Sequence, residues 1–457
     1  MKKFIAKNIG YPFQDLVKGT NILKTYEFLL ETQKWDISKL KAYQLDKLIR
    51  IIDHSYNNIP YYRDLFNSIN LKPNDIKSFD DMHKIPILTK QIARENYQKL
   101  LWPNRNKLKL KTGKTGGTTG VPLNIIKDTQ TRSFTWGSYY RWYNWIGIEI
   151  GDPVLTLWGS PTVLNQPTKQ IIKSKIGQLI SNNLKVNSFK MNQSNLHSIL
   201  NEINDFKPKL IKGYLSALLQ FADFIEEGGG IIQFQPTAIS STTETLLKPY
   251  KEYLERVFNA KMYDQYGCGE CGGIAYECGS QQGLHITMEH VYIEILNPDN
   301  TNAQFNKGKL ILTDLDNYAM PFIRYQNGDI ARVSEKKCKC GIEHTLLDSI
   351  EGRSADTIIL KDGSQVHGVF FTDILYELKS TEGKKMIRFQ VYQNESGKID
   401  FRIESEQPLN NDFLTELHFA TLRFFNEVKI SVVGKLNNEA NGKFRYIISD
   451  LPKSNSL

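Results

Sequence analysis

The pattern of hydrophobic positions divides the chain into a helical beginning, an alternating middle and a short final region. In residues 1–100 apolar side chains recur mostly at helical spacing, as Leu45, Leu48 and Ile51 do before Pro60 ends the run. Another helix is expected to begin at Thr89, whose hydroxyl suits a helix N-terminus. This mostly helical lead-in carries no candidate site.

In the middle, from about residue 110 to 350, short apolar runs alternate with helical patterns. Runs such as 152–159, 208–214 and 260–267 have the length and composition of strands. Strands separated by helices of about ten residues or more favour parallel α/β layers. The runs 290–296 and 308–316 instead predict antiparallel, barrel-like strands around a turn.

The final region predicts two hairpins, a helix and a last strand. One hairpin turns at Asp362-Gly363, and the second covers 386–405. We place the domain boundary near 351–356, with a large domain at 1–352 and a small one at 353–457. The fold class is therefore α/β: a large multilayer N-terminal domain with parallel α/β sheets plus barrel-like strands, and a small α+β C-terminal domain.

Composition and charge narrow the class of protein. The 457 residues are too many for one ordinary core, and 40% hydrophobic with 23% charged residues is typical of a soluble globular protein. The formal charge of +9 suits an anionic partner, although scattered lysines also fit a solvated surface. The basic stretch 104–114 lacks interleaved aromatic residues, so we expect no nucleic-acid partner.

The N-terminus has no apolar run of the length that a signal peptide needs. The chain also has no stretch near the roughly 18 apolar residues of a transmembrane helix. We therefore expect a cytoplasmic location.

A glycine-rich and threonine-rich loop at Thr115–Gly120 is the first candidate site. Glycines let successive backbone N–H groups turn toward a phosphate, and hydroxyls add donors. Lys114-Thr115 imitates the end of a Walker A loop, but that motif needs glycine where Leu108 stands. Taken alone, the loop fits a phosphate site and an ordinary polar turn equally well.

The order of the motifs decides between these two interpretations. The loop is followed by "YDQYGCGE", "TDLDNYAMPFIRYQNGD", "EGRSAD" and, near the end, "NGKFRY". This succession resembles the adenylate-forming ligases, and within them the phenylacetate-CoA ligase family with its capsular-polysaccharide (CapK-type) members. The resemblance extends from about Pro60 to the C-terminus. It implies an adenylate-forming ligase architecture with a mobile C-terminal domain.

The resemblance assigns a nucleotide site. It implies that Thr115, Gly116, Gly117, Thr118, Thr119 and Gly120 hold the β- and γ-phosphates of ATP, and that Thr243, Glu244, Tyr266, Asp329 and Arg353 contact adenine or ribose. Glu270 matches the carboxylate that positions Mg²⁺, a hard cation that prefers oxygen ligands. Lys443 matches the catalytic lysine, whose ammonium offsets charge between the carboxylate and the α-phosphate.

Two departures from the pattern concern the phosphate loop and the hinge. Leu123 stands where many relatives carry lysine after the loop, and the phenylacetate-type branch commonly lacks that lysine. Ala355 replaces the first aspartate of the usual hinge pair, while Asp356 remains. Domain rotation is therefore expected, with its pivot left open.

The five cysteines are clustered in one region, from Cys268 to Cys340. Three thiolates from Cys278, Cys338 and Cys340 with the imidazole of His285 would form a closed tetrahedral zinc site. The spacing is not that of a standard zinc finger, and His344 or Cys271 could replace the fourth ligand. Free buried thiols are the alternative. Cys268 and Cys271 are expected to be packing residues.

The sequence defines the carboxylic acid substrate and the acyl acceptor less well than the nucleotide site. Trp158 and Tyr214 lie in segments that resemble the acyl pocket of the family, and Gly368 lies where relatives admit pantetheine. The resulting hypothesis is a ligase that activates a carboxylate as acyl-AMP, releases pyrophosphate and transfers the acyl group to CoA. An amide or ester formed on a sugar or amino acid in surface polysaccharide synthesis is the alternative acceptor chemistry.

A catalytically idle nucleotide-binding protein is the alternative of another class. The presence of Glu270, Asp329 and Lys443 together argues against it, because binding alone needs no mobile lysine. A homodimer is compatible with the sequence. The expected cofactors are ATP and Mg²⁺, with CoA as acceptor and zinc as a structural ion, while the identity of the acid stays open.

Overall fold

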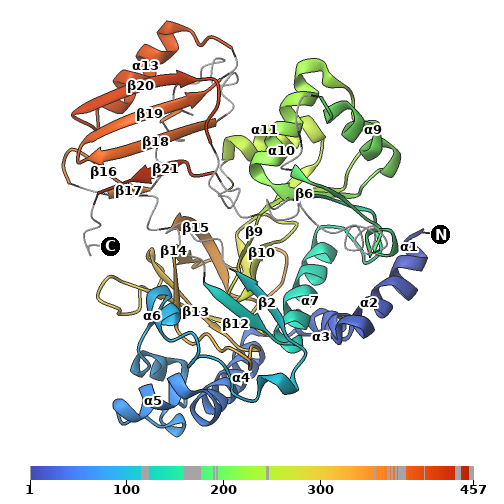
Figure 1. Cartoon of the computed structure of the whole chain (residues 1–457), viewed down its shortest axis with the longest axis vertical. Coiled ribbons are helices and arrows are strands. Elements are labelled where there is room, and N and C mark those ends of the chain that lie inside the picture. The colour runs from blue at the N-terminus through green and yellow to red at the C-terminus, as the bar shows by residue number, and fades with distance from the viewer. Residues whose placement is uncertain are drawn as a thin grey trace.

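The computed structural model describes residues 2–114, 123–158, 177–188, 191, 194–242, 246, 248–353, 357–363, 365–367, 371, 374–375, 378, 388–405, 407–437 and 444–451. Figure 1 shows a helical N-terminal region, a parallel sheet with helices, a larger mixed sheet and a C-terminal unit coloured orange to red. The α/β fold class is confirmed.

Helices dominate the first hundred residues, as the periodicity predicted. They are α1 (Lys2–Ile5), α2 (Tyr11–Lys18), α3 (Ile22–Thr32), α4 (Ile37–Asn58), α5 (Pro60–Ser68) and α6 (Lys90–Glu95). Pro60 ends the α4 pattern and opens α5, a position where its missing N–H costs no helical hydrogen bond. Thr89 caps α6 through its hydroxyl, which accepts from the N–H of Ile92.

The parallel sheet has the strand order β5-β4-β6-β7-β8 and is covered by helices on both faces. Its strands are β4 (Val154–Leu157), β5 (Asn183–Val186), β6 (Leu210–Tyr214), β7 (Ala238–Thr242) and β8 (Lys261–Tyr263). Its helices are α7 (Thr129–Trp145), α9 (Leu196–Phe206), α10 (Leu215–Phe224) and α11 (Lys248–Phe258). In such sheets ligands bind at the carboxyl ends of the strands.

The large mixed sheet has the order β12-β13-β14-β15-β11-β10-β9 and is mainly antiparallel. Its strands are β9 (Gln265–Cys268), β10 (Gly272–Glu277), β11 (Leu284–Ile286), β12 (Val291–Leu296), β13 (Gly308–Asp314), β14 (Tyr325–Val333) and β15 (Leu346–Arg353), with β1 (Leu88–Thr89) parallel to β14. A separate hairpin, β2 (Lys111–Lys114) and β3 (Asn124–Lys127), flanks the predicted phosphate loop.

The C-terminal unit contains a hairpin and a four-stranded sheet. The hairpin is β16 (Thr357–Ile359) with β17 (Gln365–His367), and the sheet of β18 (Arg388–Glu395), β19 (Lys398–Glu404), β20 (Glu427–Val433) and β21 (Ile447–Ser449) packs with α13 (Asn411–Leu422). Both predicted hairpins are confirmed. The domain boundary at 352/353 stays a prediction, as does the hinge, since 354–356 lie outside the described residues.

None of the described helices is both long and apolar enough to span a lipid bilayer.

Candidate active site and metal-ligand cluster

Glu270 lies at the tip of the hairpin that joins β9 to β10 in the large sheet. Its side chain is only 6% exposed, and its Oε1 accepts a hydrogen bond of 2.7 Å from the hydroxyl of Tyr325 on β14. Within the described residues its other oxygen, Oε2, accepts no hydrogen bond. A buried carboxylate held by one oxygen and available at the other fits a ligand for Mg²⁺.

Tyr266, Asn327 and Asp329 form a hydrogen-bonded cluster beside this hairpin. The hydroxyl of Tyr266 donates to the carboxylate of Asp329, and the amide of Asn327 donates to both, at 2.6 Å to Tyr266 and 2.7 Å to Asp329. Burial and the charge of Asp329 raise the pKa of Tyr266 well above its usual value, so this hydroxyl remains a donor. The sequence prediction that Tyr266 and Asp329 share one site is consistent with this geometry.

One strand supplies three of these side chains. Tyr325, Asn327 and Asp329 are all carried by β14, which is irregular here, with φ of +94° at Gly328 and a register shift against β13 between Gln326 and Ile330. Arg353 pairs in register with Asp329 on the neighbouring strand β15, which places its backbone beside the same carboxylate. Sequence reasoning missed Tyr325 and Asn327, although their two-residue spacing before Asp329 was visible in a strand-like run.

The cluster is also connected to the carboxyl end of β7. The amide of Gln265, next to Tyr266, donates to the hydroxyl of Ser240 at 3.4 Å and to the backbone carbonyl of Ser241 at 3.1 Å. Thr243 and Glu244 follow directly in the chain. The predicted residues that lie outside the described part of the chain are Thr115–Gly120, Thr243, Glu244, Gly368 and Lys443.

The predicted acyl-pocket residues come together at the carboxyl edge of the parallel sheet. Trp158 follows β4 and Tyr214 ends β6, and their rings stack with centroids 4.4 Å apart and planes 26° from parallel. Trp158 remains 44% exposed. A stacked and accessible aromatic pair at a ligand-binding edge is compatible with contact to an organic acid.

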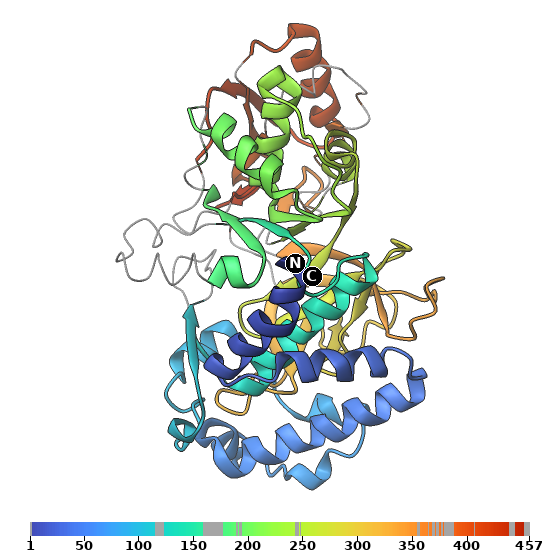
Figure 2. The same ribbon diagram turned by 90° about the vertical axis from the view of Figure 1, so that its right-hand side faces the viewer.

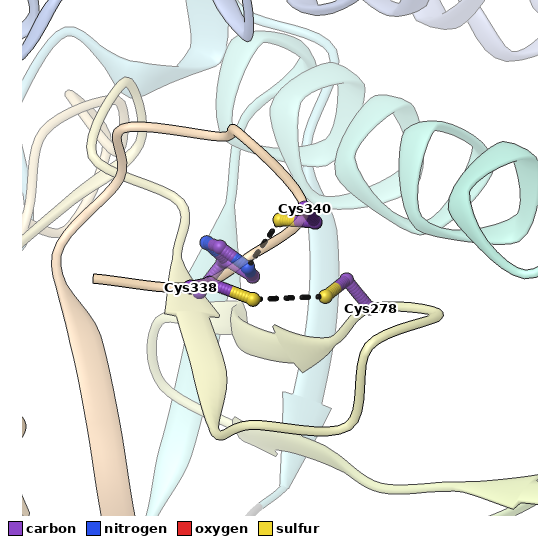
Figure 3. A group of neighbouring side chains, drawn as sticks. Cys278, Cys338 and Cys340 are labelled. Carbon is purple, nitrogen blue, oxygen red and sulfur yellow. Dashed lines mark hydrogen bonds between the residues drawn. The ribbon is translucent and has the colours of Figure 1, made fainter. Parts of the chain in front are cut away.

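The side chains of Cys278, His285, Cys338 and Cys340 converge on one point. Their potential ligand atoms all lie within 4.8 Å of one another, and Figure 3 shows the three labelled thiols turned toward a common centre. The Sγ atoms of Cys278 and Cys338 are 3.5 Å apart, and Sγ of Cys340 is 3.3 Å from Nε2 of His285. Tetrahedral zinc with bonds of about 2.3 Å to sulfur separates its ligands by roughly 3.8 Å, so the set fits zinc.

The protonation of this cluster also suits a metal. Burial lowers the pKa of His285 to about 3, and the neighbouring His344 and Arg141 act in the same direction, so the imidazole is neutral. Burial raises the pKa of the Cys340 thiol to about 12, a cost that a bound cation would reverse. His344 and Cys271, the rival fourth ligands, are not in the group, and His344 instead lies 3.5 Å from Glu289.

A second set of potential ligands, His290, Asp314 and Asp316, lies deeply buried near the Glu270 hairpin. Asp316 accepts from Lys47 at 2.6 Å and from Nδ1 of His290 at 2.8 Å. Asp314 accepts from Thr131 and from the backbone N–H of Asp316. Every carboxylate oxygen of this pair therefore has a donor already.

His290 connects the second set to Glu270. Its Nε2 lies 2.9 Å from the backbone carbonyl of Cys271, the residue after Glu270. Asp316 and this carbonyl can only accept, so His290 bridges two acceptors, and its Nε2 also lies 3.4 Å from the hydroxyl of Thr135. Burial opposes the charge on Asp316, yet Lys47 and His290 hold its pKa below the usual value. This set is an ion-paired network that fixes the hairpin.

Comparison with solved structures identifies the class of fold. The chain matches 2-hydroxyisobutyryl-CoA ligase in the postadenylation state, in complex with R3-HIB-AMP, with a TM-score of 0.75, 16% identity and 92% of both chains covered. Against the same ligase with 2-HIB-AMP and CoA in the thioesterification state the TM-score is 0.61. Anthranilate CoA ligase in complex with anthranoyl-AMP also matches, at 0.51. The fold is that of the adenylate-forming CoA ligases.

Sequence relatives then specify the branch. Phenylacetate-coenzyme A ligase of Pseudomonas putida is 25% identical over 376 residues, covering 80% of this chain and 81% of the relative. Protein CapK of Staphylococcus aureus is 22% identical and covers 99% of this chain and 100% of the relative. No family model matches the chain. The chain is a homologue of the phenylacetate-CoA ligases and of CapK, which confirms the resemblance that the motifs indicated.

Proposed function

We propose that this protein is an ATP-dependent, AMP-forming acid ligase. It activates a carboxylate as acyl-AMP, releases pyrophosphate and transfers the acyl group to CoA. The relatives and the fold support this class of enzyme. The observation that carries the proposal is that two features lie on one sheet. They are the buried carboxylate of Glu270, which has a hydrogen-bond donor on only one oxygen within the described residues, and the Tyr266–Asn327–Asp329 cluster.

Each described residue has a role in this proposal. Glu270 would hold Mg²⁺, which when bound would supply charge that offsets the repulsion between the acid and the phosphates. Asp329 accepts the ribose hydroxyls, and Asn327 and Tyr266 hold its carboxylate in place. Arg353, in register with Asp329, adds a donor near the ribose. The loop Thr115–Gly120, with Thr243, Glu244 and Lys443, completes the site by resemblance to the family.

The first test is pyrophosphate release with a range of arylacetic, uronic and amino acids, each with and without CoA. Lys443→Ala should abolish acid-dependent exchange between ATP and pyrophosphate, while leaving ATP binding largely intact. The matched control is Lys435→Ala, an exposed lysine of the same C-terminal unit. Normal exchange in the Lys443 variant would refute its assigned role.

A second test addresses the ribose contact. Asp329→Ala should weaken ATP binding by about tenfold to a hundredfold, because hydrogen bonds to a charged group contribute about 1.5–3 kcal/mol each. Tyr266→Phe keeps the ring and removes only the hydroxyl, so its loss should be smaller. Unchanged ATP affinity in the Asp329 variant would contradict the contact.

The acceptor has a second candidate. Protein CapK matches 99% of this chain, against 80% for the phenylacetate-coenzyme A ligase of Pseudomonas putida, and an acceptor other than CoA, such as an amine or a sugar, is the alternative. Product formed from acyl-AMP only when CoA is present supports the thioester. Acyl-AMP that turns over on amines or sugars and ignores CoA supports the alternative.

A structural zinc ion is also part of the proposal. The thiols of Cys278, Cys338 and Cys340 and Nε2 of His285 would bind it, closing the set without a position for substrate. Three thiolates and one imidazole in tetrahedral spacing are the donor set that zinc prefers. The role of the ion is to join β10 and β11 to the segment before β15.

A further inference from the structure

Two lysines lie on one face of the parallel sheet, close to the candidate site. Lys185 on β5 and Lys212 on β6 each pair in register with Thr156 on the central strand β4. Residues paired in this way point to the same face, and adjacent strands are about 4.8 Å apart. Lys212 reaches Tyr143 of α7, so this is the face that α7 covers.

Lys212 has no counter-ion in the described part of the chain. Its Nζ donates to the hydroxyl of Tyr143 at 2.5 Å, and no carboxylate pairs with it there. Desolvation lowers its pKa to about 8. Burial and the charges of Lys212 and Lys111 lower the pKa of Lys185 as well. A desolvated cation beside other cations is costly unless an anion joins it.

Lys212 lies beside the predicted acyl pocket, where the acid substrate is expected to bind. Tyr214 and Trp158 stand two residues beyond Lys212 and Thr156, so the stacked rings are on the same face. Ser240 pairs in register with Lys212 and accepts from Gln265, the neighbour of Tyr266. An acid in contact with the stacked rings would therefore meet the ammonium group.

We propose that Lys212 and Tyr143 bind a second carboxylate of the acid substrate, so that the substrate class is dicarboxylic acids. The inference rests on the proposed ligase function and deepens it. Burial raises the pKa of Tyr143, which keeps its hydroxyl protonated. An ammonium and a phenol O–H then offer two donors to the two oxygens of a carboxylate, while the first carboxylate remains for reaction with ATP.

The test compares acids that differ only in the second carboxylate: adipate against hexanoate, and 1,4-phenylenediacetate against 4-methylphenylacetate. In the wild type, kcat/KM for pyrophosphate release should favour the diacid of each pair by about tenfold or more. Lys212→Met should lower the diacid value by about tenfold to a hundredfold and leave the monoacid value within about twofold. Lys209→Met, on the same segment but paired with Asp152, is the matched control.

An equal loss of kcat/KM for diacid and monoacid in the Lys212 variant would overturn the proposal. Such a result would mean that Lys212 acts on the reacting carboxylate or only stabilises the fold. So would a wild type that prefers the monoacids. Calorimetry of diacid binding without ATP separates this proposal from the ligase function. Diacid binding that depends on Lys212, in a protein that releases no pyrophosphate with any acid, would refute the ligase function alone.

A separate observation concerns the N-terminal helices. Six of the fifteen exposed large hydrophobic side chains of the described residues lie within residues 4–17, and they are Phe4, Ile5, Ile9, Phe13, Leu16 and Val17. Most follow one another at spacings of three or four residues, so they form an apolar stripe along one side of α1, the π-helical turn Ala6–Gly10 and α2. Figure 2 shows these dark blue helices on the side of the molecule that faces the viewer.

The opposite side of these helices is fixed to the body of the protein. A Cβ at Gly10 would lie 2.2 Å from the carbonyl oxygen of Ile180, and one at Gly151 would lie 2.6 Å from that of Lys3. Only glycine permits these close approaches. Lys3 also pairs with Glu149 and Asp152, each at 2.9 Å. The stripe is therefore held outward by packing on its reverse side.

The charges around the stripe are positive. Lys2, Lys7 and Lys18 are exposed, and no ion pair involves them in the described residues. The one acidic residue between positions 2 and 18, Asp15, accepts from the backbone N–H groups of Ile22 and Leu23 and faces the body. An apolar stripe bordered by lysines matches the requirements of an anionic lipid surface.

We infer that α1 and α2 bind the protein to the surface of anionic membranes. Wild-type protein should sediment with vesicles of phosphatidylcholine and phosphatidylglycerol, and at least about tenfold less with phosphatidylcholine alone. The double variant Phe13→Asp, Leu16→Asp should lose this binding. Phe419→Asp, which changes an aromatic residue that is 62% exposed on α13, should keep it.

Two results would overturn this inference. One is vesicle binding that the double variant retains, or that the wild type lacks. The other is a wild-type dimer in sedimentation velocity that the double variant converts to a monomer, with no vesicle binding by either. That second result would assign the stripe to a second copy of the chain.

Discussion

Two groups of side chains in this protein bring metal-binding atoms within 4.8 Å of one another, yet they differ in what surrounds them. In the group of Cys278, His285, Cys338 and Cys340, the atoms face mainly each other. In the group of His290, Asp314 and Asp316, each carboxylate oxygen already accepts from a lysine, an imidazole, a hydroxyl or an N–H.

The difference shows that proximity alone does not define a metal site. Charge compensation decides, because a metal cation beside the ammonium group of Lys47 would meet repulsion. The cysteine group has no such cation among its own members. The first group therefore needs a metal to complete it, and the second is complete as a hydrogen-bonded network.

The largest expected effect comes from breaking the cysteine group. Cys338→Ser should reduce bound zinc from about one ion per chain to near zero and lower the free energy of unfolding by about 4 kcal/mol or more, as loss of a structural metal does. Elemental analysis and thermal unfolding under reducing conditions measure both. Cys268→Ser, at a thiol outside the group, should change neither. Wild-type protein without zinc would refute the site.

Breaking the network at its lysine should have the next largest effect. Lys47→Met leaves the buried carboxylate of Asp316 without one of its cations, which should cost about 3–5 kcal/mol of unfolding free energy. Zinc content should stay unchanged. Denaturant unfolding, with the exposed Lys41→Met on the same helix as control, checks the stability. Loss of zinc in the Lys47 variant would show that the two groups are not independent.

His290→Gln should have a smaller effect on stability and a specific effect on catalysis. It removes the imidazole ring and with it hydrogen bonds to Asp316 and to the carbonyl of Cys271, for a cost of about 1–3 kcal/mol. The carbonyl after Glu270 loses its donor, so Mg²⁺-dependent exchange of pyrophosphate should fall by about tenfold and the apparent Mg²⁺ requirement should rise. Exchange that is unchanged in rate and in Mg²⁺ dependence would refute the positioning role of His290.

The smallest effect is expected at His344, whose ring lies next to the cysteine group without joining it. His344→Gln should change stability by about 1 kcal/mol and leave the zinc content intact, because its contact is with Glu289. His285→Gln should lose zinc. If His344→Gln loses zinc as well, the ligand set is wrong.

The sequence predicted the order of the elements well because periodicity and turn residues are local signals. It also proposed Glu270, Tyr266, Asp329 and the four zinc ligands, since these lie in recognisable motifs; the structure brings the four ligands together, and the roles stay predictions. It missed the Lys47–Asp316–His290 network and the contact between Lys212 and Tyr143. These depend on pairings between segments that lie far apart along the chain, and a lysine on a strand looks like a surface residue until its neighbours are known.

One structural feature sets a limit on how this site can change. Tyr325 holds Glu270 and Asp329 belongs to the nucleotide cluster, and both are carried by β14. Between them β14 carries a bulge and a glycine, Gly328, with φ of +94°, so this local backbone sets the spacing between the two functions. Most substitutions along β14 can alter which groups are presented, but a changed spacing needs a change in this bulge, for example at Gly328, where a side chain would strain the backbone.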